Sequence, residues 1–371
     1  MKAILMAGGF GTRLRPLTIN TPKPMVPMGN RPMMEHIVQL LKENGFDDLI
    51  VMLYYQPEVI IRHFGDGAAF GVKIQYLRPQ ADLGTAGCIK YAEKWLDNTF
   101  LVISGDLLTD FDLKSVVAAH RQTKATASLV LTRVTNPLEY GVVIVDDTNR
   151  IQRFLEKPSW GEVFSDTINT GIYLLEPSVL KEIPAERSFD FSKNLFPLLL
   201  EQQVPMFGHI LKGYWKDVGD LSEYRLAHYD LLDNNVRATI NGTSEKMGNG
   251  TLISGRGTHI APKVVFEGRV LLGDGCSIGE QATLSNCVLG NNVTIRAGAE
   301  LTGCIVWDEA TIGEYAELEE SVIGSRCLID DRAQVAEGAI IGDDCLIGKG
   351  AHIHSNVKIW PHKSVEDGAV L

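Results

Sequence analysis

The sequence predicts an α/β protein with a mixed, mostly parallel sheet, followed by a parallel β-helix of hexapeptide repeats. Up to about residue 235, apolar runs alternate with amphipathic stretches, whereas beyond residue 250 aliphatic residues recur at every sixth position. The chain has 371 residues, and one domain usually has roughly 100–200. We therefore predict domains at 1–235 and 251–371, joined by a polar, glycine-containing linker at 236–250.

The first domain is predicted from its alternating pattern. Apolar, strand-like runs occur at 2–8, 47–55, 72–78 and 100–106, and amphipathic helical stretches occur at 32–45, 57–65, 85–96 and 113–123. This order is typical of a parallel sheet with helices on both faces and ligands at the carboxyl ends of the strands. Runs at 125–134, 140–147 and 168–177 have fewer helices between them and predict a mixed or antiparallel portion. A last helix is expected at about 221–234.

The second domain is predicted from its period of six. The longest series comprises Ile329, Val335, Ile341, Ile347, Ile353, Ile359 and Val365. Earlier aliphatic residues form triplets of sixes joined by a step of five, so that each coil has 17 or 18 residues. This period indicates a parallel β-helix with the aliphatic side chains inside, and it resembles the left-handed β-helix of hexapeptide-repeat proteins.

The cysteines are expected to be core residues. Cys276, Cys327 and Cys345 occupy the fifth place of their hexads, and Cys287 and Cys304 end successive coils. The sequence has no CxxC pair or metal-ligand spacing among its cysteines, which argues against a zinc site or disulfide exchange chemistry.

Charge and hydropathy exclude some classes of partner. The net charge of −11 argues against binding to nucleic acid or to an anionic membrane, since both favour a basic surface. No apolar run has the length of a signal peptide or a membrane span, so we expect a cytoplasmic protein. The first 34 residues nevertheless contain five basic residues and no acidic one, which suits a local anionic ligand.

A glycine-rich turn, AGGFGTRLRPLT, follows the first predicted strand. Such turns bring backbone N–H groups close to phosphate. A dinucleotide fingerprint requires a third glycine where this sequence has Leu14, and a P-loop requires a Lys-Ser or Lys-Thr pair that is missing at that spacing. Both common phosphate-binding folds are therefore excluded.

The continuation GGFGTRLRPLTINTPKPMVPMGNRPM resembles the signature of the nucleotide-sugar pyrophosphorylases, closest to their mannose-1-phosphate guanylyltransferase branch. The resemblance extends through LGTAG, SGDLL, EYGVV, FLEKP, INTGIY, GYWKDVG and the hexapeptide repeats. It implies a Rossmann-like nucleotidyltransferase domain. It also implies transfer of a nucleotidyl group from GTP to mannose 1-phosphate, giving GDP-mannose and pyrophosphate.

The resemblance also implies the site residues. Catalytic cations are expected at Arg13 and Lys23. Nucleotide-binding residues are expected at Gly8, Gly9, Gly11, Thr12, Gly84 and Thr85. Sugar-phosphate-binding residues are expected at Gly141, Glu156, Lys157 and Asn169, and Mg²⁺ ligands at Asp106 and Asp217. Carboxylates suit Mg²⁺, which prefers hard oxygen ligands.

Alternatives remain open at this point. The same reaction type could use glucose 1-phosphate with UTP, dTTP or ATP, or the chain could be a nucleotide-sugar sensor without turnover. His352, His354 and His362 lie in uninterrupted late hexads, which disfavours acetyl transfer by the β-helix. We expect the β-helix to serve assembly or regulation, and we expect a homo-oligomer that involves it. Because the sequence ends without a phosphomannomutase-like domain, isomerisation of mannose 6-phosphate is not expected.

Overall fold

The computed structural model describes residues 1–163 and 165–371, which form two compact units. The first unit comprises Met1–Phe10 and Met33–Asp217, and the second comprises Gly11–Pro32 and Val218–Leu371. Most of the glycine-rich signature therefore belongs to the same unit as the hexapeptide repeats. The predicted domains are continuous segments of the sequence, and their bounds stay a prediction.

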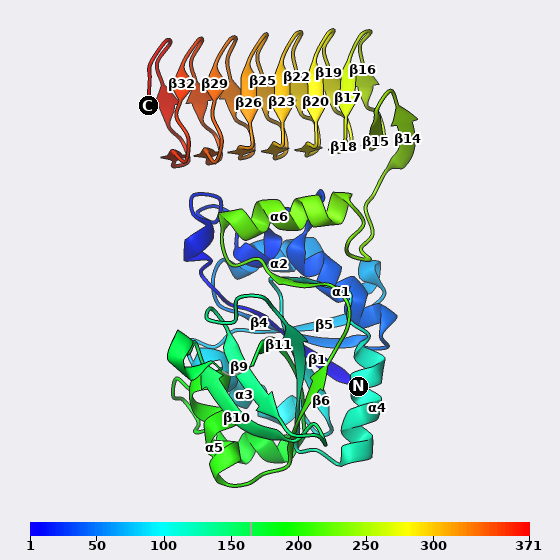
Figure 1. Cartoon of the computed structure of the whole chain (residues 1–371), viewed down its shortest axis with the longest axis vertical. Coiled ribbons are helices and arrows are strands. Elements are labelled where there is room, and N and C mark those ends of the chain that lie inside the picture. The colour runs from blue at the N-terminus through cyan, green and yellow to red at the C-terminus, as the bar shows by residue number, and fades with distance from the viewer. Residues whose placement is uncertain (164) are drawn as a thin grey trace. The chain divides into compact units, whose positions relative to one another are not determined.

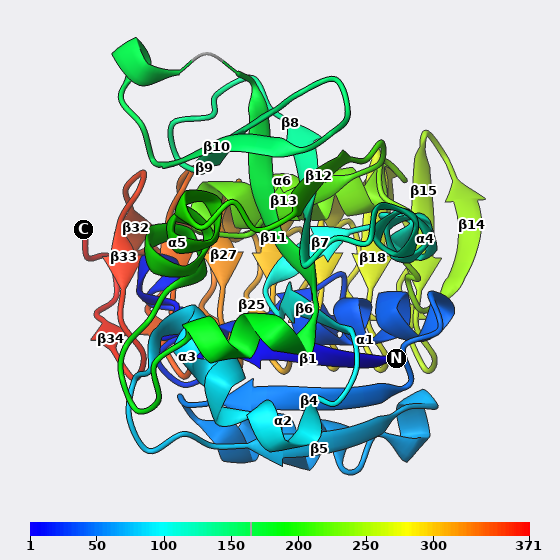
Figure 2. The same cartoon turned by 90° about the horizontal axis from the view of Figure 1, so that it is seen from below.

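The first unit is built on a mixed sheet (Figures 1 and 2). Its main path runs through β10 (Ile151–Glu156), β9 (Gly141–Val145), β11 (Thr167–Leu175), β6 (Phe100–Ser104), β1 (Lys2–Ala7), β4 (Asp48–Leu53) and β5 (Lys73–Leu77). Beside β11 lies β8 (Ala127–Arg133), which also pairs with β12 (Met206–Ile210). The strands β6, β1, β4 and β5 are parallel, whereas β11 is antiparallel to β6 and β8. The predicted fold class is confirmed, including its antiparallel portion.

Helices flank this sheet, and all of them except α5 lie where the alternating pattern predicts. They are α1 (Met33–Glu43), α2 (Pro57–Phe64), α3 (Gly84–Tyr91), α4 (Leu113–Thr123) and α5 (Phe196–Glu201). Residues of α3 and α5 share one apolar core with β1 and β4, in which Ile4, Ile89 and Phe196 are fully buried. A separate ribbon is formed by β7 (Leu107–Thr109) and β13 (Trp215–Asp217). In the described part of the chain, no helix combines the length and hydropathy needed to cross a membrane.

The second unit contains the β-helix and α6 (Leu221–Leu232), together with a short hairpin of β2 (Pro27–Met28) and β3 (Arg31–Pro32). One sheet of the β-helix consists of β14 (Thr243–Met247), β15 (Gly250–Ser254), β18 (Arg269–Leu272), β21 (Val288–Leu289), β24 (Ile305–Val306), β27 (Val322–Ile323), β30 (Ile340–Ile341) and β33 (Lys358–Ile359). The second consists of β16 (His259–Ile260), β19 (Ser277–Ile278), β22 (Thr294–Ile295), β25 (Thr311–Ile312), β28 (Leu328–Ile329), β31 (Leu346–Ile347) and β34 (Ser364–Val365). The third consists of β17 (Val265–Glu267), β20 (Thr283–Ser285), β23 (Glu300–Thr302), β26 (Glu317–Glu319), β29 (Gln334–Val335) and β32 (His352–Ile353).

Successive coils of the β-helix stack in register, as the yellow-to-red part of Figure 1 shows. Ile312 pairs with Ile329, and Ile329 pairs with Ile347, so each sixth-position aliphatic residue lies above its counterpart in the next coil. Cys276, Cys287, Cys304, Cys327 and Cys345 are all at most 2% exposed in the same core. The predicted periodicity and the predicted burial of these cysteines are confirmed. The sixth cysteine, Cys88 on α3, was also expected to be buried, but it is only partly buried. Residues Thr243–Met247 of the predicted linker form β14, which pairs antiparallel with β15. This part of the linker is therefore an edge strand of the first of the three β-helix sheets.

Candidate functional site

Asp106 and Asp217, the predicted metal ligands, are brought together in the first unit by the ribbon of β7 and β13. Asp106 directly precedes β7, and Asp217 lies opposite Leu107 in the antiparallel register. The Gly105 N–H donates to the Met6 carbonyl at 2.9 Å, which fixes the turn between β6 and β7 beside the end of β1. The Ser104 hydroxyl donates to the Asp106 carboxylate. Two aspartates that are far apart in sequence therefore have neighbouring backbone positions, Asp106 just before β7 and Asp217 at the end of β13.

Asp110, which the sequence reasoning did not single out, clamps this ribbon. Its carboxylate accepts the Tyr214 N–H at 2.7 Å, and the Thr109 hydroxyl donates to the Tyr214 carbonyl at 2.7 Å. Asp110 is 9% exposed, so it is a buried carboxylate held by a backbone donor. The sequence signal was an aspartate directly after a short apolar strand. Asp110 thus stabilises the ribbon on which the two predicted ligands lie.

The glycine-rich turn begins in the first unit with Gly8 and Gly9. A side chain at Gly8 would place its Cβ 3.2 Å from the Cβ of Tyr54, whereas Gly9 has open space around it. The exposed Phe10 ring packs edge-on against Tyr54, with ring centroids 5.6 Å apart, and against Tyr55 at 5.5 Å. Gly8 therefore permits close packing of the turn on the loop after β4, and the open surroundings of Gly9 leave its backbone accessible to a ligand.

Gly84 and Thr85 start α3 and are bound to the segment 189–191. Gly84 has a φ of +67°, and a Cβ there would lie 2.8 Å from the Phe189 carbonyl oxygen, so only glycine fits this turn. The Thr85 hydroxyl donates to Asp190 at 2.8 Å and accepts the Phe191 N–H at 3.0 Å. This Thr85 side chain is thus used for packing the loop. A contact from either residue to a nucleobase stays a prediction.

The four predicted sugar-phosphate residues lie around β9, β10 and β11. Gly141 pairs with Glu156, and a Cβ at Gly141 would lie 2.9 Å from Glu156 Oε2. Asn169 on β11 donates to the Tyr173 hydroxyl at 2.9 Å. The exposed Lys157 follows β10, and its backbone N–H donates to the Tyr140 carbonyl at 3.1 Å. The absence of a side chain at Gly141 therefore leaves room for the Glu156 carboxylate.

Ser192 links two of these residues and was missed from the sequence. It lies on a π-helical turn, Phe191–Leu195, where the Asp190 carboxylate accepts its N–H at 2.9 Å. Its hydroxyl is 3.5 Å from Asn169 Nδ2, and it also bonds the Glu156 carboxylate. A serine in a polar loop has no distinguishing pattern in the sequence. Its position beside Glu156 and Asn169 makes it a further candidate for contact with a polar ligand.

The Glu156 carboxyl has a raised pKa in the folded protein. Burial is the main cause, and the nearby Asp190 carboxylate adds to it, while Lys157 and Ser192 act in the opposite direction. The folded protein consequently retains the proton above the ordinary pKa of 4.5. Stability contributed by this group is therefore greatest below pH 4.5 and falls as the pH rises through the higher folded-state pKa.

We expect Glu156→Gln to raise the melting temperature at pH 7 by about 1–2 °C, because the half-buried charge is removed and solvent screening keeps the effect small. The gain should disappear below pH 4.5, where the native carboxyl is also neutral. Thermal unfolding followed by circular dichroism at several pH values measures this. Glu162→Gln is the matched control with the opposite sign, because the Ser159 N–H and hydroxyl lower the pKa of Glu162. A pH-independent gain for Glu156→Gln would contradict the prediction.

Gly11 and Lys23 lie against each other in the second unit. Gly11 has a φ of +61°, and a Cβ there would lie 2.9 Å from Lys23 Cβ and 3.1 Å from Thr18 Cγ2. The Thr18 hydroxyl donates to the Gly11 carbonyl at 2.7 Å, which holds the two parts of the segment together. Lys23 is only 7% exposed. Glycine at position 11 is therefore required for the close approach of the turn to this buried cation.

Thr12 and Arg13 are exposed on a short 3₁₀ turn, Thr12–Leu14. A Cβ at Gly219 would lie 3.1–3.3 Å from the guanidinium of Arg13, so this glycine gives the arginine room to pack on the chain just before α6. The structure thus brings Gly11, Thr12, Arg13 and Lys23 into one segment of the second unit. The remaining predicted site residues belong to the first unit.

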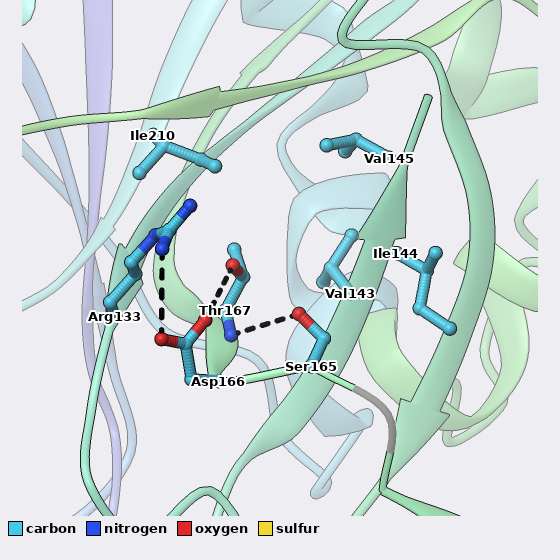
Figure 3. Close-up of a pocket in the computed structure, with 8 residues that line it drawn as sticks. All are labelled: Arg133, Val143, Ile144, Val145, Ser165, Asp166, Thr167 and Ile210. Atoms are coloured by element: carbon cyan, nitrogen blue, oxygen red, sulfur yellow. Dashed lines mark hydrogen bonds and ion pairs between the residues drawn. The ribbon is translucent and has the colours of Figure 1, made fainter. Parts of the chain in front are cut away.

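A separate pocket of about 570 Å³ lies in the first unit, at the ends of β8, β9, β11 and β12 (Figure 3). Its lining residues are Arg133, Val143, Ile144, Val145, Ser165, Asp166, Thr167 and Ile210. Arg133 Nη1 is 3.8 Å from Asp166 Oδ2, and both side chains are exposed, so this ion pair contributes little to stability. The pocket contains none of the predicted site residues.

Two family models match this chain. A model for nucleotidyl transferases matches residues 2–234, and a model for the EIF2B subunit epsilon LbH domain matches residues 249–353. The chain belongs to the nucleotidyl transferase family. The second match supports the left-handed β-helix predicted for the C-terminal part of this nucleotidyl transferase.

Similar proteins carry names for related reactions. The UTP–glucose-1-phosphate uridylyltransferase of Synechocystis sp. is 34% identical over 321 residues, covering 78% of this nucleotidyl transferase and 82% of the relative. Mannose-1-phosphate guanylyltransferase 1 of Arabidopsis thaliana is 35% identical over 296 residues, covering 78% of each chain. A solved structure from Bacillus anthracis, named a "putative glucose-1-phosphate thymidylyltransferase", is 28% identical with a TM-score of 0.57, covering 62% of this chain and 94% of that one. The nucleotidyltransferase assignment is confirmed, whereas the role of each predicted site residue stays a prediction.

Proposed function

We propose that the protein transfers a nucleotidyl group from GTP to mannose 1-phosphate, giving GDP-mannose and pyrophosphate. The observation that carries the proposal is the pairing of β7 with β13, which places Asp217 opposite Leu107, the residue directly after Asp106. Asp106 and Asp217 were predicted as ligands of one ion, and this register puts their backbones close to each other. Curated relatives named mannose-1-phosphate guanylyltransferase from several organisms support the choice of substrates.

The proposed reaction is an in-line displacement at the α-phosphorus. An oxygen of the sugar phosphate forms the new P–O bond, and the bond to pyrophosphate breaks. The attacking oxygen is already anionic, so the main requirement is to position and neutralise negative charge. In this proposal Arg13 and Lys23 bind the triphosphate, and Lys157 binds the sugar phosphate. Glu156 and Asn169 form hydrogen bonds with the sugar hydroxyls. Gly8, Gly9 and Gly11 permit backbone N–H groups to approach phosphate.

The donor set suits Mg²⁺. Mg²⁺ is commonly held by one or two carboxylates together with substrate phosphates and water. Asp106 and Asp217 would supply those two carboxylates. In the described residues, no cluster of three or more His, Cys, Asp or Glu side chains is arranged for a metal. When bound, the ion would neutralise charge on the phosphates.

A second candidate function uses UTP and glucose 1-phosphate. The observation that favours it is the Synechocystis relative named UTP–glucose-1-phosphate uridylyltransferase, which matches over 78% of this chain. Discrimination between nucleotides depends on a few contacts in the pocket, each worth only a few kcal/mol. The two candidates share the reaction type and the residues named above, and they differ in the base and the sugar.

A matrix of GTP, UTP, dTTP and ATP against mannose, glucose and glucosamine 1-phosphates, read by pyrophosphate release with Mg²⁺, tests the proposal. We expect GTP with mannose 1-phosphate to have the highest kcat/KM. A tenfold preference for glucose 1-phosphate with UTP or dTTP would replace the substrate assignment and keep the reaction type. Binding of a nucleotide sugar without turnover in every combination would instead favour a sensor.

A further inference from the structure

The second half of the signature, PMGNRP, is a β-hairpin in the second unit. Pro27–Met28 pairs antiparallel with Arg31–Pro32, and the turn residues Gly29 and Asn30 both have positive φ, +58° and +63°. Two consecutive positive φ values define the type I′ turn that closes two-residue hairpins. The hairpin begins shortly after the 3₁₀ turn Lys23–Met25. Contacts that fix the position of the hairpin therefore also restrict the position of Lys23.

A chain of buried hydrogen bonds connects this hairpin to the β-helix. Trp307 Nε1 donates to the Tyr224 hydroxyl at 3.1 Å, and the Tyr224 hydroxyl donates to the Pro27 carbonyl at 2.6 Å. Tyr224 is fully buried, and Trp307 is 3% exposed. A buried phenol and a buried carbonyl need such partners, because a polar group left unpaired away from water is destabilising. The chain therefore couples a β-helix side chain to the backbone four residues after Lys23.

Trp307 is an exception in its column of the β-helix. Equivalent places in the flanking coils hold Gly273, Gly290, Gly324 and Gly342, and the last coil has Trp360 there, as successive backbone hydrogen bonds between the coils show. Trp360 is exposed, so Trp307 is the buried indole of this column. An indole at this place is not required by the β-helix repeat. Its burial and its hydrogen bond to Tyr224 account for the exception.

Two more contacts join the segment 11–32 to other coils. Asn30 Nδ2 donates to the Leu289 carbonyl at 2.7 Å, and Asn20 Nδ2 donates to Asp343 Oδ2 at 3.3 Å. Asp343 is 4% exposed, and its other oxygen accepts the Ser325 N–H at 2.9 Å. Asn20 and Asn30 lie on either side of Lys23 in sequence. The β-helix thus contacts the segment before and after this lysine.

We propose that the β-helix positions the phosphate-binding segment, residues 11–32. The central contact runs from Trp307 through the Tyr224 hydroxyl to the Pro27 carbonyl. The inference rests on the proposed function in that Arg13 and Lys23 bind the phosphates. Trp307 and Tyr224 are positioning residues, because they act through the backbone of the segment. The same α6 that carries Tyr224 follows Gly219, on which Arg13 packs. Both cations of the segment are therefore supported by this part of the second unit.

Tyr224→Phe tests the proposal, with Tyr229→Phe as the matched control. Both tyrosines lie on α6, but the Tyr229 hydroxyl donates to the Gly303 carbonyl of the β-helix at 2.9 Å. We expect Tyr224→Phe to accelerate amide hydrogen exchange in peptides from residues 11–32 at least threefold relative to Tyr229→Phe, at similar melting temperatures. We expect it to raise KM for the nucleotide roughly three- to tenfold with a smaller change in kcat, because the Pro27 carbonyl loses its donor and Trp307 Nε1 loses its acceptor.

The exposed Asn20 offers a second variant that leaves the core intact. Asn20→Ala should accelerate exchange in the same peptides, because it removes the contact to Asp343. Equal exchange in Tyr224→Phe, Asn20→Ala and Tyr229→Phe would overturn the positioning role. Exchange is measured without substrate, so it decides this inference even if the wild-type protein releases no pyrophosphate, a result that would refute the proposed function alone.

Discussion

Asp106→Asn should lower kcat for pyrophosphate release by about a thousandfold or more, the scale expected when a principal electrostatic contact to the reacting phosphates is lost. The amide keeps the shape of the side chain and can still accept the hydrogen bond from Ser104. It removes one of the two negative charges that the ribbon of β7 and β13 supplies for Mg²⁺. Steady-state rates measured across a range of Mg²⁺ concentrations test this expectation, and the apparent affinity for Mg²⁺ should also fall.

The nearby Asp112→Asn variant is the matched control for this experiment. Asp112 is exposed and caps α4 by accepting the N–H groups of Lys114 and Ser115, and asparagine caps a helix about as well as aspartate. We expect Asp112→Asn to keep the wild-type rate and melting temperature. If Asp106→Asn retained activity within threefold at every Mg²⁺ concentration, Asp106 would not be a metal ligand.

The sequence predicted best those parts of the fold that repeat. In the β-helix each sixth-position aliphatic residue must enter the core, so a single register satisfies the whole series from Ile329 to Val365. The first unit was predictable because alternating strands and helices leave few ways to order a mainly parallel sheet. In both cases many residues favour the same secondary structure and the same buried face, and the tertiary packing is consistent with them.

Contacts made by single side chains were not predictable in the same way. Ser192 reaches Glu156 and Asn169 through the π-helical turn, and no period in the sequence indicates such a turn. The placement of segment 11–32 with the β-helix depends on a few hydrogen bonds, such as that from Asn30 to the Leu289 carbonyl. A visible signal was Trp307, a large aromatic residue where the flanking coils have glycine, although Trp360 occupies the same place in the last coil. Its significance requires knowledge of what lies beside that column.

The convergence of Asp106 and Asp217 illustrates the difference between resemblance and derivation. Asp106 directly precedes one short strand and Asp217 ends another, but neither local pattern indicates that the two strands are partners. The family resemblance predicted a shared ion, and the antiparallel register of β7 and β13 explains how the fold brings the backbones of the two residues close together. Asp110 then explains why the ribbon persists, because it ties the end of β7 to the residue before β13.

Lys23→Met should lower kcat/KM for the nucleotide by about a hundred- to a thousandfold, because a charged hydrogen bond to phosphate is worth about 3–4 kcal/mol in a site that excludes water. Lys23 is 7% exposed, so its positive charge is held in a buried place beside Gly11. Methionine keeps most of the apolar stem that packs there and removes the ammonium group. Pyrophosphate release as a function of nucleotide concentration measures the loss.

Lys363→Met, at an exposed corner of the β-helix, controls for the loss of a positive charge as such. It should leave kcat/KM unchanged, since solvent and salt screen the charge of an exposed side chain. Melting temperatures of both variants separate a catalytic loss from unfolding. Retention of kcat/KM within threefold in a folded Lys23→Met protein would remove Lys23 from the phosphate site. A large loss of kcat/KM with an unchanged melting temperature would mean that the Lys23 ammonium group binds the ligand and contributes little to folding stability. The close approach of Gly11 to Lys23 would then help to position this group for the ligand.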